Sequence, residues 1–216
     1  MKKNYEMDMC SGPILGKLLT FTIPLIFSGI LQLLFNAADV IVVGRFAGSQ
    51  SLAAVGSTTA LINLMINIFI GLSVGVNVIV ARYYGAKREK DVQDTIHTAM
   101  ALSIVSGLFL IIVGQLLSRP MLELMGTPDD VIDKSTIYMR IIFIGMPANM
   151  IYNFGSAILR AVGDTKRPLY FLTAAGVINV VLNLFFVIMF QMDVAGVALA
   201  TAISQAISAC LVILCL

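Results

Sequence analysis

The sequence predicts an all-α integral membrane protein, a bundle of six transmembrane helices. Three observations lead to this prediction. Of the 216 residues, 59% are hydrophobic, only 12% are charged, and the charges lie in short islands between long apolar runs. Soluble domains carry about 25% charged residues, so this composition leaves too few charges to cover a water-soluble surface.

Six apolar runs are long enough to cross a bilayer, whose core of about 30 Å needs about 20 residues of α-helix. They are residues 18–43, 52–80, 96–117, 137–159, 169–190 and 195–216. Lipid offers no partner to backbone polar groups, and the runs lack the alternation of barrel strands, so helices are expected. We expect one domain, 1–216, and the end of the last run at Leu216 without a charged tail is the pattern of a truncated protein.

The lysines and arginines predict the orientation. Placing both termini in the cytoplasm puts ten of the 14 Lys and Arg residues inside and leaves Arg45, Arg119, Lys134 and Arg140 outside. This is the usual bias of membrane proteins, so we expect a multi-pass protein of the cell membrane. A net charge of +2 without a clustered basic face argues against a nucleic-acid partner, which leaves the lipid bilayer as the expected surroundings.

The first span carries a polar stripe. Ser28, Gln32, Asn36 and Asp39 are spaced by four, four and three residues, which places them on one helix face. Asp39 is the one carboxylate within a predicted span, where an ionised side chain costs about 2.5–3.5 kcal/mol. Burial disfavours the charged carboxylate, so Asp39 is a candidate to exchange a proton near neutral pH. The alternatives are Na⁺, coordinated together with amide and hydroxyl oxygens, or contact with interfacial water at the outer end of the span.

Later spans repeat such stripes. The second has Asn63 and Asn67, the fourth Asn149, Asn153, Ser156 and Arg160, the fifth Gly176, Asn179 and Asn183, and the sixth Thr201, Ser204, Gln205 and Ser208. Any single amide is explained by interhelical hydrogen bonding, at about 0.6 kcal/mol. The whole set indicates a polar cavity, for which the predicted lining is Gln32, Asn36, Asn63, Asn67, Asn149, Asn153, Ser204 and Gln205.

Two prolines lie inside predicted spans. Pro24 in the first span and Pro147 in the fourth each remove a backbone hydrogen bond and favour a kink. Both are candidate hinges, with a static bend as the alternative.

Catalytic patterns are absent from the sequence. The single histidine, His97, has neither a nucleophile nor a metal partner nearby in sequence, and no Walker loop, Rossmann glycine fingerprint or zinc-ligand pair occurs. We therefore predict no enzyme, no cofactor and no metal site other than a possible Na⁺ at Asp39, and an ion gradient as the energy source for transport.

Several stretches resemble the multidrug and toxic compound extrusion (MATE) transporters. They are the segment from Pro24 through "LLFNAADVIVVGRFAGSQSLAAVG", then "ARYYGAK", "YMRIIFIGMPANMIYNFGSAILRAVGDTKRP", "NVVLN" and "GVALATAISQ". The similarity covers nearly the whole chain, and the segment from Arg160 to Pro168 is its most specific part.

The resemblance implies a polyspecific antiporter that exports organic, often cationic, small molecules against H⁺ or Na⁺. Such exporters have two six-helix lobes related by a pseudo-two-fold axis along the membrane normal, a known arrangement for alternating access. The chain resembles the N-terminal lobe, so a C-terminal lobe is the expected missing partner.

The resemblance also implies a cation network. In proton-coupled relatives it joins a first-helix aspartate, a fifth-helix asparagine and acid, and a sixth-helix threonine, which fall on Asp39, Asn179, Asn183 and Thr201. Asn183 is an amide where some relatives have a second carboxylate, so the choice between H⁺ and Na⁺ stays open. Two alternatives remain: a lipid-linked precursor flippase, whose cavity should be more basic, and a non-transporting membrane subunit that docks another lobe or protein.

Overall fold

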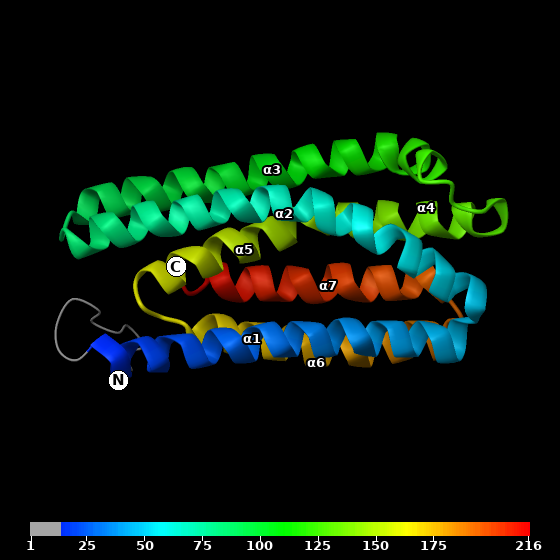
Figure 1. Cartoon of the computed structure of the whole chain (residues 1–216), viewed down its shortest axis with the longest axis horizontal. Helices are drawn as coiled ribbons and strands as arrows, with labels where there is room; N and C mark the ends of the chain where they lie inside the picture. The colour runs from blue at the N-terminus through cyan, green and yellow to red at the C-terminus, as the bar shows by residue number, and fades with distance from the viewer. Residues whose placement is uncertain (1–13) are drawn as a thin grey trace.

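Residues 14–216 are described in the computed structural model of the chain, and they form helices and short connections without a β-strand. Figure 1 shows the bundle. The helices are α1 (Ile14–Val42), α2 (Ser49–Gly85), α3 (Glu89–Leu124), α4 (Asp129–Ile144), α5 (Met146–Ala161), α6 (Lys166–Leu184) and α7 (Asp193–Ile213). Two π-helical turns, η1 (Val43–Ala47) and η2 (Phe185–Met189), extend α1 and α6. The predicted all-α membrane bundle is confirmed.

Five of these helical segments are long and apolar enough to cross a membrane, and α4 with α5 makes a sixth span bent by 48°. The break between α4 and α5 falls at Gly145, so Pro147 lies in the first turn of α5. In contrast, α1 continues through Pro24 as one uninterrupted helix. Of the two predicted kinks, the one near Pro147 therefore coincides with a break.

The helix ends extend beyond several predicted spans. Helix α3 continues for seven residues on each side of the predicted 96–117 segment, because its terminal turns are polar yet still helical. Glu89 and Asp91 in its first turn suit the positive end of the helix dipole. The N-terminus, predicted to be cytoplasmic, lies outside the described residues, and the C-terminus lies at the end of the bundle where α1 begins (Figure 1).

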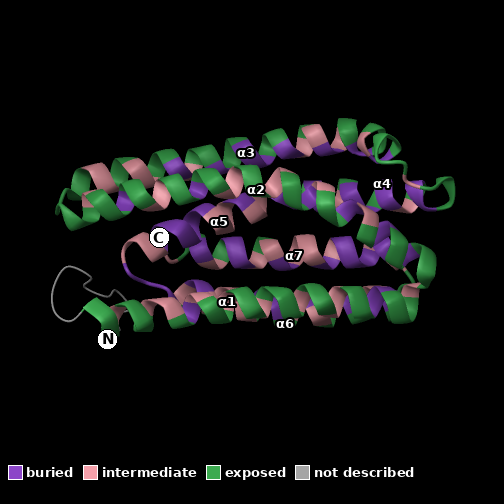
Figure 2. Cartoon of the chain, viewed as in Figure 1, coloured by how far each residue is buried: buried purple, intermediate pink, exposed green. Residues whose placement is uncertain are grey.

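The helices pack as two groups that share α7. Helix α1 packs on α6 and α6 on α7, whereas α2 and α3 pack against α4 and α5, and α7 contacts both α4 and α5. In its most apolar stretch α7 is 44% buried and α1 only 6%. Figure 2 shows the same contrast, with buried residues along α7 and exposed ones along α1. Helix α7 is thus the centre of the bundle and α1 its outer wall.

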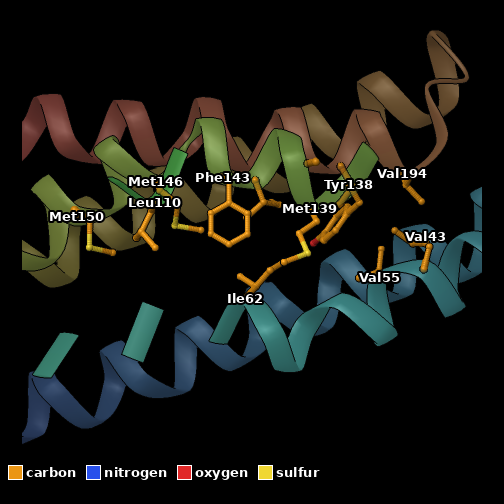
Figure 3. Packing of buried hydrophobic residues seen from close by; sticks show 14 of the residues in the cluster. Val43, Val55, Ile62, Leu110, Tyr138, Met139, Phe143, Met146, Met150 and Val194 are labelled. Carbon is orange, nitrogen blue, oxygen red and sulfur yellow. The ribbon is translucent and has the colours of Figure 1, made fainter. Parts of the chain in front are cut away.

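The apolar core lies between α2, α3 and the bent α4–α5 pair, and it extends to the start of α7 and to η1 (Figure 3). Phe143 and Met146 are fully buried there, on either side of the break. A Cβ atom on Gly114 of α3 would overlap the Phe143 ring, and one on Gly107 would overlap Pro147. Small residues allow such close helix approach in membranes. The core therefore holds the bent span firmly against α3 and leaves the polar stripes on the opposite side.

Candidate functional site

A cavity of about 600 Å³ lies between α1, α2, α5, α6 and α7. This volume is in the range of small-molecule sites. Six of the eight residues predicted to line a cavity lie on its wall, together with Asp39, Asn179 and Thr201; the six are Gln32, Asn36, Asn149, Asn153, Ser204 and Gln205. The stripes of four spans therefore converge on one space.

Asn63 and Asn67 do not reach the cavity, contrary to the sequence-based expectation. They are exposed, and the α2 wall of the cavity consists instead of Ile70, Val74 and Asn77. The five positions are spaced by four and three residues, so they share one face of α2. The described helices enclose that face only along its later turns. Asn77, which the sequence analysis missed, donates its Nδ2 to the carbonyl oxygen of Ala157 on α5 at 2.6 Å.

A chain of hydrogen bonds joins the predicted cation-network residues across three helices. Asn183 on α6 is fully buried, and its Nδ2 donates to Asp39 Oδ1 on α1 and to Asn179 Oδ1 at 3.1 Å. Asn179 Nδ2 in turn donates to Thr201 Oγ1 on α7 at 3.2 Å. The Thr201 hydroxyl donates to the Val197 carbonyl oxygen at 3.0 Å. Asp39 thus shares one hydrogen-bond network with the other three residues of the predicted set.

Close packing of α1 on α6 positions this network. A Cβ atom on Gly176 of α6 would overlap the Phe35 ring of α1, so only glycine lets the ring lie there. Gly176 precedes Asn183 by two helical turns, and Phe35 precedes Asp39 by about one. The contact therefore fixes the distance between the two helices next to the Asp39–Asn183 hydrogen bond.

Within residues 14–216, Asp39 has a hydrogen bond but no counter-ion, and the five salt bridges there involve other groups. Among the described residues on the cavity wall, Asp39 is also the single carboxylate and Arg160 has the single guanidinium. The Asn183 Oδ1 atom next to it is buried without a hydrogen bond in the described structure. The site therefore offers an uncompensated carboxylate and an unused amide oxygen.

A second polar cluster, which the sequence analysis missed, lies outside the cavity where α7 begins. Lys134 Nζ on α4 lies 2.7 Å from Asp193 Oδ2 on α7 and donates to Ser51 Oγ on α2 at 3.1 Å. Ser51 donates to the other carboxylate oxygen of Asp193. Asp193 has a positive φ of 54°, a left-handed conformation that aspartate tolerates better than most residues. Here the acid has its cation within the chain.

The described residues contain no group of three or more His, Cys, Asp or Glu side chains that could hold a metal ion. His97 lies exposed on α3. A Na⁺ ion at Asp39 would instead depend on amide and hydroxyl oxygens around a single carboxylate, a donor set suited to a hard cation.

A membrane lobe of helices around a polar cavity with an embedded acid defines the class of multi-pass membrane transporters. The MatE family model matches residues 24–185. The chain therefore belongs to the MatE family, whose members are transporters and not enzymes.

The chain is similar to two curated proteins of Bacillus subtilis (strain 168). It is 35% identical to the probable multidrug resistance protein YoeA, covering 85% of this chain and 41% of the relative. It is 31% identical to the probable multidrug resistance protein YpnP, covering 93% and 45%. A solved outward-facing multidrug resistance MATE family transporter of the MOP superfamily is 26% identical, with a TM-score of 0.85 over 91% of this chain and 43% of that one. The chain thus spans less than half the length of these relatives.

Proposed function

We propose that the chain forms one lobe of a secondary active exporter, which moves organic small molecules out of the cell in exchange for H⁺ or Na⁺ bound at Asp39. The observation that supports this most is the hydrogen-bonded series from Asp39 through Asn183 and Asn179 to Thr201, beside a cavity of about 600 Å³. The names of the two Bacillus relatives support a role in drug resistance.

The absence of a counter-ion supports ion binding at Asp39. A lone carboxylate within a membrane span is costly when ionised. Lys134 provides the compensating charge for Asp193, but none of the described residues provides one for Asp39. A proton or a sodium ion would remove that cost, and this links the charge of the site to the gradient across the membrane.

Asn183 suits both states of Asp39. In the structure its NH₂ group donates to the carboxylate, as a charged Asp39 requires. Rotating the amide by about 180° presents Oδ1, which accepts from a protonated Asp39 or binds Na⁺ together with other oxygens. The rotation exchanges the Nδ2 hydrogen bonds to Asp39 and Asn179 for new ones, while Oδ1, which is buried without a partner, has no bond to lose. An amide at this position is thus compatible with either ion.

The low burial of α1 provides a route from ion binding to transport. Among its described residues, α1 buries only Pro24 and Val42, so few side chains hold it in place. When Asp39 is neutralised it no longer needs water, and α1 can then bend at Pro24, repack and shrink the cavity. Pro147, at the α4–α5 break, is the second hinge of the proposal.

The proposal keeps both termini of the lobe cytoplasmic and places the transport path between this lobe and a second one. A lipid-linked precursor flippase has less support, since the described residues give the cavity wall one guanidinium and one carboxylate, which is not a basic surface.

Gradient-driven efflux in membrane vesicles tests the proposal. The protein as its gene encodes it is compared with the Asp39→Asn variant, with ethidium as the substrate and an imposed H⁺ or Na⁺ gradient. We expect Asp39→Asn to abolish the gradient-driven part of efflux. The amide is not protonated near neutral pH, and it has no negative charge to neutralise a bound Na⁺. Asp94→Asn is the matched control, since Asp94 is an exposed carboxylate on α3.

Unchanged efflux in Asp39→Asn would refute ion coupling at this residue. Wild-type vesicles in which neither gradient drives efflux would favour the non-transporting subunit.

A further inference from the structure

A second charged group lines the cavity, far from Asp39. Arg160 lies near the end of α5, on the wall that also includes Pro168 of α6. Tyr152 of α5 donates its hydroxyl to the Pro168 carbonyl oxygen at 3.2 Å, which places this part of α5 beside the start of α6. Pro168 and Asn183 are separated by fifteen residues of α6, about 22 Å of helix. The cavity therefore has a cationic end and an acidic end.

Arg160 has no acid partner among the described residues. Its nearest carboxylate in sequence, Asp164, accepts hydrogen bonds from the backbone N–H groups of Lys166 and Arg167 at 3.1 Å. The same carboxylate pairs with the Arg167 side chain at 3.2 Å. Asp164 is thus committed to the start of α6, and Arg160, which lines the cavity, pairs with no anion in the described part of the chain.

Polar groups surround Arg160 on the cavity wall. The Ser156 hydroxyl, one turn earlier on α5, is buried and makes no hydrogen bond of ordinary geometry with another described residue. A Cβ atom on Gly155 would overlap Val212, so this stretch of α5 lies against the last turns of α7. Ser208, one turn before Val212, lines the same cavity, but its hydroxyl donates to the Gln205 carbonyl oxygen at 2.8 Å. The Ser156 hydroxyl and the Arg160 guanidinium are therefore the groups available at this end.

This combination suits an oxyanion. A guanidinium binds a carboxylate or phosphate through two parallel hydrogen bonds, and charge-assisted hydrogen bonds are about twice as strong as neutral ones. In a membrane cavity a cation without a counter-charge is costly, as an acid is. A ligand that brings its own oxyanion removes this cost and provides a partner for the Ser156 hydroxyl.

We propose that Arg160, with Ser156, forms an anion subsite of the cavity that binds the carboxylate, sulfonate or phosphate group of an organic substrate. The inference rests on the proposed export function and narrows it: the preferred substrates are organic anions or zwitterions whose acidic group lies at the Arg160 end, away from the ion at Asp39. A phospholipid headgroup offers the same oxyanion chemistry. The position of Arg160 on the cavity wall favours a soluble molecule.

Equilibrium binding of two matched dyes tests the subsite. Rhodamine B has a free carboxylate, and its ethyl ester has the same ring system with that carboxylate masked. Fluorescence polarisation measures both affinities for the purified protein, as its gene encodes it, in phospholipid-free detergent and without an ion gradient. We expect the wild type to bind the acid at least about fivefold more tightly than the ester, a ratio that one charge-assisted contact readily supplies.

Three variants separate a binding role from a structural one. Arg160→Gln is expected to remove the preference for the acid while changing the affinity for the ester less than about twofold, and Arg160→Lys to keep part of the preference. Arg45→Gln is the matched control, because Arg45 is exposed and lies outside the cavity lining. Should Arg160→Gln fail to fold, the wild-type ratio and Arg160→Lys still decide the question.

A wild type that binds both dyes equally, or neither, would overturn the proposal, as would an Arg160→Gln variant that weakens both dyes to the same extent. Displacement of rhodamine B by added phosphatidylglycerol, but not by equal phosphatidylcholine, would assign the site to a lipid headgroup and overturn the substrate assignment. Because no gradient is present, these outcomes are independent of Asp39 coupling. If the wild type shows no preference for the acid dye, the proposal of ion-driven export is unaffected. If it does show this preference, the result is no evidence for ion binding at Asp39.

Discussion

Two acids in this chain sit in polar clusters of similar construction, and they differ in one respect. Asp193 accepts from the Ser51 hydroxyl and pairs with Lys134 at 2.7 Å. Asp39 accepts from the Asn183 amide and has no cation among the described residues. Asp193 is neutralised by a cation of the described chain, whereas Asp39 has none within residues 14–216. This difference separates a fixed connection between helices from a candidate ion site.

The surroundings of the two acids match these roles. About a third of the Asp193 side chain is exposed, at the end of the bundle where α2, α4 and α7 meet. Asp39 lies within a membrane span and on the wall of a cavity. Ions from water can reach Asp39 through the cavity. Asp193 already has Lys134 as its cation and needs no ion from solution.

Substituting Gly176 should disturb the Asp39 cluster and leave the Asp193 cluster intact. Gly176→Val forces the Phe35 ring off α6, and overpacking of this kind costs about 1–3 kcal/mol. We expect the thermal unfolding midpoint in detergent to fall and the response to the coupling ion to weaken. Gly71→Val is the control, because a Cβ atom there meets no atom within 4 Å. Equal effects of the two substitutions would mean that the Gly176 contact does not position Asp39.

A double-mutant cycle on Lys134 and Asp193 should report a smaller, purely structural coupling. Lys134→Met, Asp193→Asn and the double variant are expected to give a coupling energy of about 1 kcal/mol, the upper range for partly exposed pairs. Denaturant unfolding measures it. Gradient-driven efflux by the double variant should keep the ion dependence of the wild type. Its loss would show that the Asp193 cluster takes part in coupling.

Substitutions of the α2 amides should give the smallest difference in the free energy of unfolding. Asn77→Ala removes the hydrogen bond to the Ala157 carbonyl oxygen and should cost about 0.6 kcal/mol, the average for such bonds in membrane bundles. Asn63→Ala is the matched control and should change stability little, since Asn63 is exposed. The same unfolding assay compares them, and a larger cost for Asn63 would place the functional face of α2 at its earlier turns.

This contrast shows where the sequence is informative. The spacing of Asn63 and Asn67 identified the correct face of α2, because helical periodicity determines which side chains share a face. Periodicity does not tell which turns of that face another helix covers. Asn63 and Asn67 therefore share a helix face with the α2 residues that line the cavity but lie on earlier turns, and Asn77 was missed.

The sequence singled out Asp39 but not Asp193. Asp39 stood out because a carboxylate within an apolar run is costly. Lys134 and Asp193 lie 59 residues apart near the ends of their spans, where single charges are common, so only the folded chain brings them together. Apolar runs also showed the bundle itself, but not that the fourth span breaks at Gly145, since the residues directly on both sides of it, Ile144 and Met146, are apolar.

The central claim is that Asp39, and not Asp193, binds the coupling ion. The most direct measurement is the thermal unfolding midpoint of the purified protein at stepped Na⁺ concentrations and at pH values between about 6 and 8, because an ion that binds only the folded state stabilises it by about 2.7 kcal/mol at 100 times its Kd. We predict that the wild type and Asp193→Asn respond equally to one of the two ions and that Asp39→Asn loses this response. A full response in Asp39→Asn, or its loss in Asp193→Asn, would contradict the account.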